Sequence, residues 1–161
     1  MITLVLGGAR SGKSAVAERR AGDGPVTYIA TFVGDDDRDM AARVAAHQAR
    51  RPAHWTTVET ADLVGAVRAA EPGTVLVDSL TTWVAGSTGY AVDAAGLGLA
   101  MGSHAGDVIV VSDEVGLGVH PSTEEGRRFR DALGMVNQAV SAVADVALLV
   151  VAGRVLRLDP A

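Results

Sequence analysis

Short apolar runs rich in β-branched residues alternate along the chain with longer segments whose apolar residues recur at helical spacing. Each short run is apolar throughout, which is typical of strands covered on both faces of a parallel sheet. The last run is followed by a turn at Gly153 and Arg154 and by a second apolar stretch, Val155–Leu158, and this pattern predicts a hairpin. The predicted strands are Ile2–Leu6, Val26–Ala30, Val75–Val77, Val108–Val111 and Ala147–Val151.

Helical segments separate these strands, and strands interleaved with helices predict an α/β fold with a mainly parallel sheet. No linker, repeat or low-complexity tract divides residues 1–161, so one domain is expected. The stretch Ala85–Gly106, rich in Gly, Ala and Ser, predicts either a loose segment or a short helix. The predicted helices are Lys13–Ala21, Asp37–Arg50, Ala61–Ala70 and Thr123–Ala144.

Composition limits the possible partners. The 161 residues are 48% hydrophobic, and 19 acidic against 14 basic side chains give a net charge of −5, so a broad basic face for nucleic acid is not expected. Cysteine is absent, which excludes thiolate metal sites and disulfides. The chain starts directly in an apolar strand and has no apolar run of membrane-spanning length, so we expect a cytoplasmic protein with no membrane insertion and a small-molecule partner.

The most specific motif lies between the first predicted strand and the first predicted helix, and it fits G-x-x-x-x-G-K-[ST] without a mismatch. Such a loop binds phosphates through its backbone N–H groups, its lysine reaches the terminal phosphates and its serine hydroxyl ligates Mg²⁺. Lys13 is the one lysine in the chain, and a planar guanidinium does not replace a compact ammonium there. The predicted phosphate-binding residues are Gly7, Gly8, Ala9, Arg10, Ser11, Gly12, Lys13 and Ser14.

A magnesium site needs a carboxylate as well, and Asp78 follows the buried run Val75–Val77. The predicted metal ligands are therefore Ser14 and Asp78. An Asp that only caps the next helix is the competing interpretation. Asp113 and Glu114 follow the next strand in the same way and are the second candidates for holding the metal or positioning water. Asp78 is favoured for the ion and Glu114 for a role on the acceptor side.

The segment Asp37–Arg51 is unusual for a plain nucleotide-binding protein. On a helix His47 lies one turn from Arg43 and Arg50, with Arg51 beside them. Nearby arginines disfavour the protonated ring, so His47 is expected to be neutral and nucleophilic, next to groups that can bind a phosphate. A solvated basic face with an incidental histidine is the alternative on these residues alone.

Further blocks give the chain a family resemblance that extends over nearly its whole length. The P-loop reads G-G-A-R-S-G-K-S, the His47 region reads A-A-R-V-x-x-H-x-x-x-R-P-x-H-W, and a later block reads E-V-G-x-G-V-x-P. With Tyr28–Thr31, Val77–Thr81, Arg128–Asp131 and Asn137-Gln138 they resemble the bifunctional adenosylcobinamide kinase/adenosylcobinamide-phosphate guanylyltransferase family of cobalamin biosynthesis.

The resemblance implies a three-layer, RecA-like P-loop NTPase fold and two reactions. A kinase step moves the γ-phosphoryl group of a nucleoside triphosphate, ATP or GTP, to adenosylcobinamide. In the second step a histidine attacks the α-phosphate of GTP, and GMP then passes to the corrinoid phosphate; His47 matches this catalytic nucleophile. The resemblance also implies Mg²⁺, a corrinoid substrate and a homo-oligomer, namely a trimer.

Carried over by position, the family pattern adds nucleotide contacts at Thr31, Phe32, Val33, Gln48, Ala49, Arg50, Arg51, Glu59 and Asp78. Three features depart from the pattern: Phe32 replaces a small hydroxyl residue, Asp113 replaces a common Asn, and the stretch between Trp83 and Val108 is short. Asp113 adds negative charge near any bound phosphate, and the short stretch is a candidate for the corrinoid pocket or subunit contacts.

The other histidines are expected to have structural roles. His54, the second candidate for the nucleophile, precedes Trp55 and a likely strand, which favours packing, while His104 and His120 lie in segments typical of surface turns. A P-loop ATPase or GTPase that regulates a partner, without covalent nucleotidyl transfer, is the alternative function.

Overall fold

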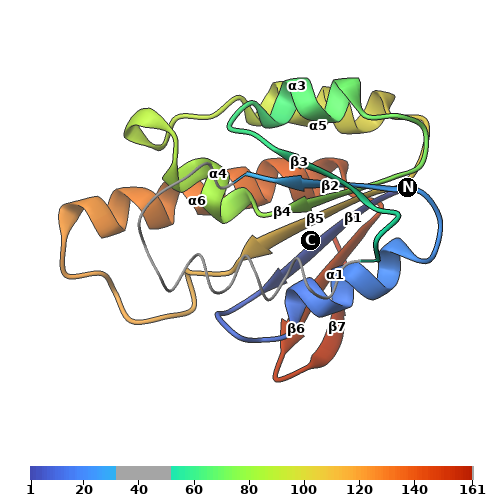
Figure 1. Cartoon of the computed structure of the whole chain (residues 1–161). Coiled ribbons are helices and arrows are strands. Elements are labelled where there is room, and N and C mark those ends of the chain that lie inside the picture. The colour runs from blue at the N-terminus through green and yellow to red at the C-terminus, as the bar shows by residue number, and fades with distance from the viewer. Residues whose placement is uncertain (32–51, 161) are drawn as a thin grey trace.

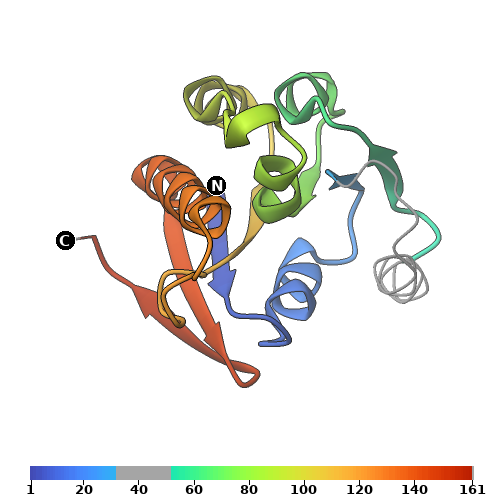
Figure 2. The same ribbon diagram turned by 90° about the vertical axis from the view of Figure 1, so that its left-hand side faces the viewer.

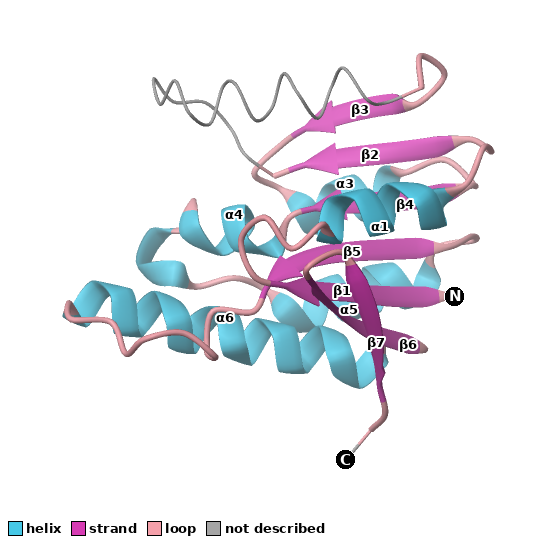
Figure 3. Cartoon of the chain, turned by 90° about the horizontal axis from the view of Figure 1, so that it is seen from below, coloured by secondary structure: helices cyan, strands magenta, loops and turns pink. Residues whose placement is uncertain are grey.

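In the computed structural model, which describes residues 1–31 and 52–160, the strands form one seven-stranded sheet (Figure 3). The strand order is β3-β2-β4-β5-β1-β6-β7. All neighbouring pairs are parallel except β6 and β7, which form an antiparallel hairpin at one edge. The strands are β1 (Ile2–Gly7), β2 (Val26–Ala30), β3 (Thr56–Glu59), β4 (Thr74–Asp78), β5 (Val108–Asp113), β6 (Val146–Val151) and β7 (Arg154–Leu158).

Helices cover both faces of the sheet, so the fold has three layers and belongs to the α/β class (Figures 1 and 2). Helix α1 packs on one face, while the other face carries α3, α4, α5 and α6. The described helices are α1 (Lys13–Ala21), α3 (Leu63–Ala69), α4 (Leu80–Ala85), α5 (Ala94–Ser103) and α6 (Glu124–Val143), with a 3₁₀ turn, η1, at Thr88–Tyr90.

The central strands are apolar on both faces because each face has its own layer of helices. In β5, Ile109 and Val111 belong to the core on the α1 side, whereas Val108 and Val110 belong to the core on the opposite side. Successive side chains of a strand point to opposite faces, so a strand in the middle of three layers must be apolar at every position. This explains the unbroken apolar runs of the sequence.

The parallel strands end together at one edge of the sheet. Gly7 at the end of β1 is opposite Asp113 of β5, and Asp78 at the end of β4 is opposite Ala30 of β2. The loops that follow these strands therefore share this edge, which in parallel α/β sheets is where ligands bind.

The predicted strands and the hairpin are confirmed, with ends that differ by one or two residues. The hairpin turn lies at Ala152 and Gly153, one residue before the predicted position, because Arg154 already pairs with Val151. Helix α1 has the predicted bounds. Helix α6 begins one residue later than predicted because Thr123 is its N-cap, the side chain accepting a hydrogen bond from the Gly126 N–H.

The prediction for Ala61–Ala70 was too long. Helix α3 starts only at Leu63, because the Asp62 carboxylate accepts the Gly65 N–H and caps the helix there. The predicted helix over Asp37–Arg50 lies outside the described residues.

The Gly- and Ala-rich stretch 85–106 contains a helix of ten residues, α5, so the helical alternative is the correct one for its second half. Asp93 caps α5 by accepting the Gly96 N–H, and Leu97 and Met101 are buried against the rest of the core. Burial of these side chains stabilises a helix whose glycines disfavour it. Within the described residues, no helix is both long and apolar enough to cross a membrane.

Candidate functional site

The loop between β1 and α1 has the tight backbone that a phosphate-binding loop requires. Gly12 is left-handed with φ 96° and Arg10 with φ 57°. Gly7 has no room for a side chain, because a Cβ there would lie 2.7 Å from the Val150 carbonyl oxygen and 2.5 Å from Ser11 Oγ. The loop ends at the N-terminus of α1, whose unpaired N–H groups and positive dipole end attract anions.

The turn between β6 and β7 supports this loop from the side. The Gly153 N–H donates a 2.8 Å hydrogen bond to the Ser11 carbonyl, and a Cβ on Gly12 would lie 3.5 Å from Gly153 Cα. The support comes from the opposite end of the sequence, which the order of the strands brings next to the P-loop.

Lys13 forms an ion pair with Asp113. Its Nζ lies 2.5 Å from Asp113 Oδ1 and also donates to the Gly8 carbonyl at 3.3 Å. The two side chains are only 13% and 23% exposed. Asp113 is on the same face of β5 as Val111, which is the α1 face, and β5 neighbours β1 directly. The tertiary structure therefore places a carboxylate against the P-loop lysine.

The backbone of Asp113 is held from both sides. Its N–H donates to Thr81 Oγ1 at 2.9 Å, and its carbonyl accepts a 3.1 Å hydrogen bond from Asn137 Nδ2. In addition, the Glu114 N–H donates to the Gly7 carbonyl at 3.1 Å. These bonds fix the end of β5 against α4, α6 and the P-loop.

Asp78 is the last residue of β4 and faces the same side as Asp113. Tyr28 Oη donates a 2.6 Å hydrogen bond to Asp78 Oδ2, and the Tyr28 ring stacks on Trp55 with centroids 6.4 Å apart. Because β5 lies between β4 and β1, Asp78 is about 10 Å from the end of β1. The competing interpretation of Asp78 as a helix cap is wrong, because Ser79 caps α4 and accepts the Thr82 N–H.

Thr31 and Glu59 follow β2 and end β3, on the side of the sheet edge away from the P-loop. The Thr31 hydroxyl is buried and lies 2.6 Å from both the Ser79 carbonyl oxygen and Thr82 Oγ1. Glu59 is exposed and opposite Ala30 on the edge strand. The strand order puts β3 about 19 Å from β1, so these residues and the P-loop form opposite ends of one long edge.

The remaining predicted site residues lie outside the described residues: His47, Phe32, Val33, Gln48, Ala49, Arg50 and Arg51. Their predicted roles stay predictions.

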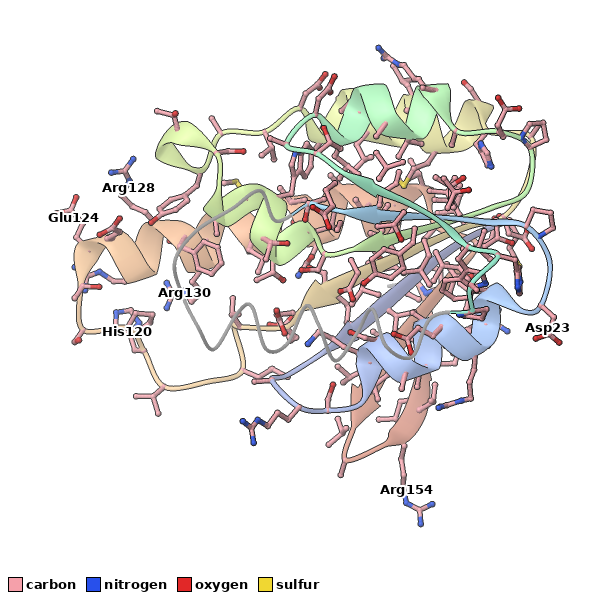
Figure 4. All side chains as sticks on the ribbon, in the orientation of Figure 1. Asp23, His120, Glu124, Arg128, Arg130 and Arg154 are labelled. Atoms are coloured by element: carbon pink, nitrogen blue, oxygen red, sulfur yellow. The ribbon has the colours of Figure 1, made fainter. Side chains whose placement is uncertain are left out.

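The described histidines show no common site. His54 is exposed, so the packing role expected for it is wrong, and it is Trp55 that is buried. His104 Nε2 lies 3.0 Å from the Gly73 carbonyl oxygen, a structural contact. His120 Nδ1 lies 2.9 Å from Arg130 Nη1 on the exposed side of the loop after β5 (Figure 4). Across the described ranges, no three metal-ligating His, Asp or Glu side chains cluster together.

A separate open hollow of about 580 Å³ lies between the end of α4, η1 and the start of α6. Tyr90 lines it and donates a 3.0 Å hydrogen bond to Glu125, which raises the pKa of the Tyr90 hydroxyl. Its other lining residues include Arg128, labelled in Figure 4. This hollow belongs to the short stretch that the sequence marked as a candidate for corrinoid or subunit contacts.

Sequence reasoning did not find the Lys13–Asp113 pair or the residues that hold it. The sequence indicates that Asp113 adds negative charge near a bound phosphate, and Thr81 and Asn137 belong to blocks of the family resemblance, but no pattern indicates that these three residues meet. The missing information was the strand order, because only the pairing of β1 with β5 brings Asp113 to Lys13.

Comparisons with known proteins show the family of the chain. Residues 3–158 match the model of the CobU family, described as cobinamide kinase / cobinamide phosphate guanyltransferase. The bifunctional adenosylcobalamin biosynthesis protein CobP of Pseudomonas aeruginosa is 42% identical, with 95% of this chain and 94% of that protein aligned. CobU of Salmonella typhimurium, of the same description, is 39% identical, with 95% and 97% aligned.

Solved structures show the same fold at low sequence identity. The P4 protein of bacteriophage phi6 in complex with ADP superposes with a TM-score of 0.50 and 17% identity, over 96% of this chain and 53% of that one. The flagellar accessory protein FlaH of Methanocaldococcus jannaschii gives a TM-score of 0.52 and 13% identity, over 96% and 74%. These likenesses concern the fold, and the mainly parallel sheet with helices on both faces confirms the predicted three-layer α/β architecture.

Proposed function

The chain belongs to the cobinamide kinase / cobinamide phosphate guanyltransferase family, and from this premise we propose how its residues divide the two reactions. It is a kinase and nucleotidyltransferase of cobalamin biosynthesis, and the match over residues 3–158 is the observation that carries this conclusion. A regulatory P-loop module without nucleotidyl transfer is not favoured.

The P-loop holds the phosphates of ATP or GTP. Its left-handed residues Arg10 and Gly12, the N-terminus of α1 and the ammonium of Lys13 form an anion site at the end of β1. The hydroxyl of Ser14 and the carboxylate of Asp78 are hard oxygen donors of the kind that Mg²⁺ takes. When bound, the ion neutralises charge that develops on the transferring phosphoryl group.

In the kinase step the corrinoid hydroxyl oxygen forms a bond to the γ-phosphorus, the bond to the β-phosphate bridging oxygen breaks, and the hydroxyl proton is released. Lys13 orients the terminal phosphates, since its Nζ lies next to the P-loop backbone and donates a hydrogen bond to the Gly8 carbonyl. Such a transfer depends mainly on positioning and charge stabilisation.

In the guanylyltransferase step His47 attacks the α-phosphorus of GTP and pyrophosphate leaves. The corrinoid phosphate then takes the guanylyl group and frees the histidine. Support for His47 comes from its place in the family pattern and from the arginines around it in the sequence. Phosphate contacts from Arg50 and Arg51 would stabilise the charge that develops on the α-phosphate. Thr31–Val33, Gln48, Ala49 and Glu59 complete this end of the site.

A labelling experiment tests the assignment. Incubation with α-labelled GTP and Mg²⁺ leaves label on the protein that is labile to acid and stable to alkali, as a phosphoramidate is. His47→Ala removes the label, whereas His54→Ala, a change at an exposed histidine seven positions later, keeps it. Added cobinamide phosphate then carries the label away. Equal labelling of wild type and His47→Ala contradicts the assignment of the nucleophile.

The assembly is a homotrimer, an expectation supported by the family resemblance and by the exposed hairpin edge. Every residue of β7 is exposed, and Val155, Leu156 and Leu158 are 46%, 58% and 39% exposed. An exposed edge strand that carries apolar side chains offers a surface on which a partner subunit can pack. Light scattering during size-exclusion chromatography measures the mass, and a monomer would contradict this part of the proposal.

A further inference from the structure

The carboxylate of Asp113 stands where the lysine of a phosphate-binding loop should meet its ligand. We propose that Asp113 is a built-in competitor of the nucleotide for Lys13. It holds the ammonium in the empty site, loses it to the terminal phosphates when they bind, and so determines the affinity for di- and triphosphates. This rests on the proposed role of the P-loop in binding nucleotide phosphates.

Lys13 and Asp113 form an ion pair that a bound phosphate would have to break. Lys13 Nζ lies 2.5 Å from Asp113 Oδ1, so the two opposite charges are in direct contact. The two side chains are 13% and 23% exposed, so water screens the pair much less than it screens a surface ion pair. A phosphate that binds Lys13 must replace this interaction, which lowers the net gain from binding.

Hydrogen bonds hold the backbone of Asp113 in place, so a backbone shift cannot move the residue away from the P-loop. Its N–H is bound to Thr81 Oγ1, its carbonyl is bound to the buried Asn137, and the next N–H is bound to Gly7 of the P-loop strand. Only rotation of the short side chain remains, so after the exchange the carboxylate is still near the P-loop, as a like charge for the terminal phosphates. Both effects act against the phosphates that Lys13 serves.

The consequence is an exchange of ion pairs in which no covalent bond changes. Lys13 moves from carboxylate to phosphate when the nucleotide enters, and returns to Asp113 when the diphosphate or pyrophosphate product leaves. Asp113 is thus a specificity-determining residue that weakens the binding and speeds the release of nucleotides whose terminal phosphates reach Lys13.

The test compares nucleotides that differ only in their phosphates. The affinities of GTP, GDP and GMP are measured by calorimetry at one Mg²⁺ concentration for wild type and for Asp113→Asn, which removes the charge and keeps the shape. The matched control is Asp107→Asn, because Asp107 also pairs with an ammonium, the N-terminal one, at 3.0 Å, in a pair that is more than half exposed.

We expect Asp113→Asn to bind GTP and GDP about tenfold more tightly, which corresponds to about 1.4 kcal/mol, and to release GTP more slowly. GMP does not reach Lys13, so its affinity should change less than twofold, and Asp107→Asn should leave all three affinities unchanged. Thermal unfolding verifies that the variant is folded; if it is not, Asp113→Ser takes its place with the same expectation.

Unchanged or weaker GTP binding by the folded variant overturns the proposal. An equal change for all three nucleotides also overturns it, because it would indicate a general structural effect. If the wild type itself binds no nucleotide, the P-loop assignment fails and this proposal fails with it. Loss of His47 labelling with normal GTP binding, in contrast, concerns only the proposed nucleophile.

Discussion

Replacing Gly7 with alanine tests whether the P-loop depends on close packing against the end of β6. A Cβ at this position would lie 2.7 Å from the Val150 carbonyl oxygen and 2.5 Å from Ser11 Oγ. The serine hydroxyl can rotate away, but the carbonyl belongs to the strand paired with β1, with Gly7 opposite Val150. The strand or the loop must therefore shift.

The expected loss of folding stability in Gly7→Ala follows from the difference between a hydroxyl that can rotate and a carbonyl that is fixed in a strand. Inserting a methyl group into a packed site costs about 1–3 kcal/mol, and we expect about 3 kcal/mol because backbone is displaced. For a chain of this size the melting temperature would fall by about 6–12 °C. Nucleotide binding should weaken too, since Gly7 is also opposite Asp113 and joins the loop.

Urea and thermal unfolding give the measurement, and Gly8→Ala is the matched control. A Cβ on Gly8 meets no atom within 4 Å, so this neighbouring substitution should cost much less. Adding Ser11→Ala to Gly7→Ala should restore less than half of the loss, because the carbonyl contact remains. Equal stability of the Gly7→Ala and Gly8→Ala variants would refute the packing argument.

Two other outcomes can be measured directly. Lys13→Ala should weaken GTP binding about 10- to 150-fold in calorimetry, since one or more hydrogen bonds to a charged group, each about 1.5–3 kcal/mol, are lost. Lys13→Arg should not restore full binding, because a planar guanidinium does not replace the compact ammonium. Unchanged affinity of Lys13→Ala would count against the P-loop assignment. Glu125→Gln should lower the pKa of Tyr90, because the hydrogen bond to the Glu125 carboxylate is the main cause of its raised value. The alkaline titration of phenolate absorbance then moves to lower pH, with Tyr28 as the one other tyrosine, and an unmoved midpoint would contradict that cause.

Local patterns in the sequence were sufficient for most elements. The apolar runs predicted the strands because strands with helices on both faces bury every side chain, and helix α1 follows directly from the residues after the P-loop. The bounds were less accurate where a single side chain decides them. Asp62 starts α3 two residues later than the periodicity indicated. The glycines of α5 left a loose segment and a short helix as alternatives, and burial of Leu97 and Met101 favours the helix.

The sequence by itself determined the α/β class, the P-loop and the family, because each depends on residue types at fixed short spacing. The tertiary structure decided which groups meet. It placed Asp113 against Lys13 and Gly153 against Ser11, and it left Asp78 one strand further away. These contacts join residues about a hundred positions or more apart, and they depend on the order of strands in the sheet. A local pattern cannot encode that order, since the central strands are apolar on both faces and each fits equally well beside several others.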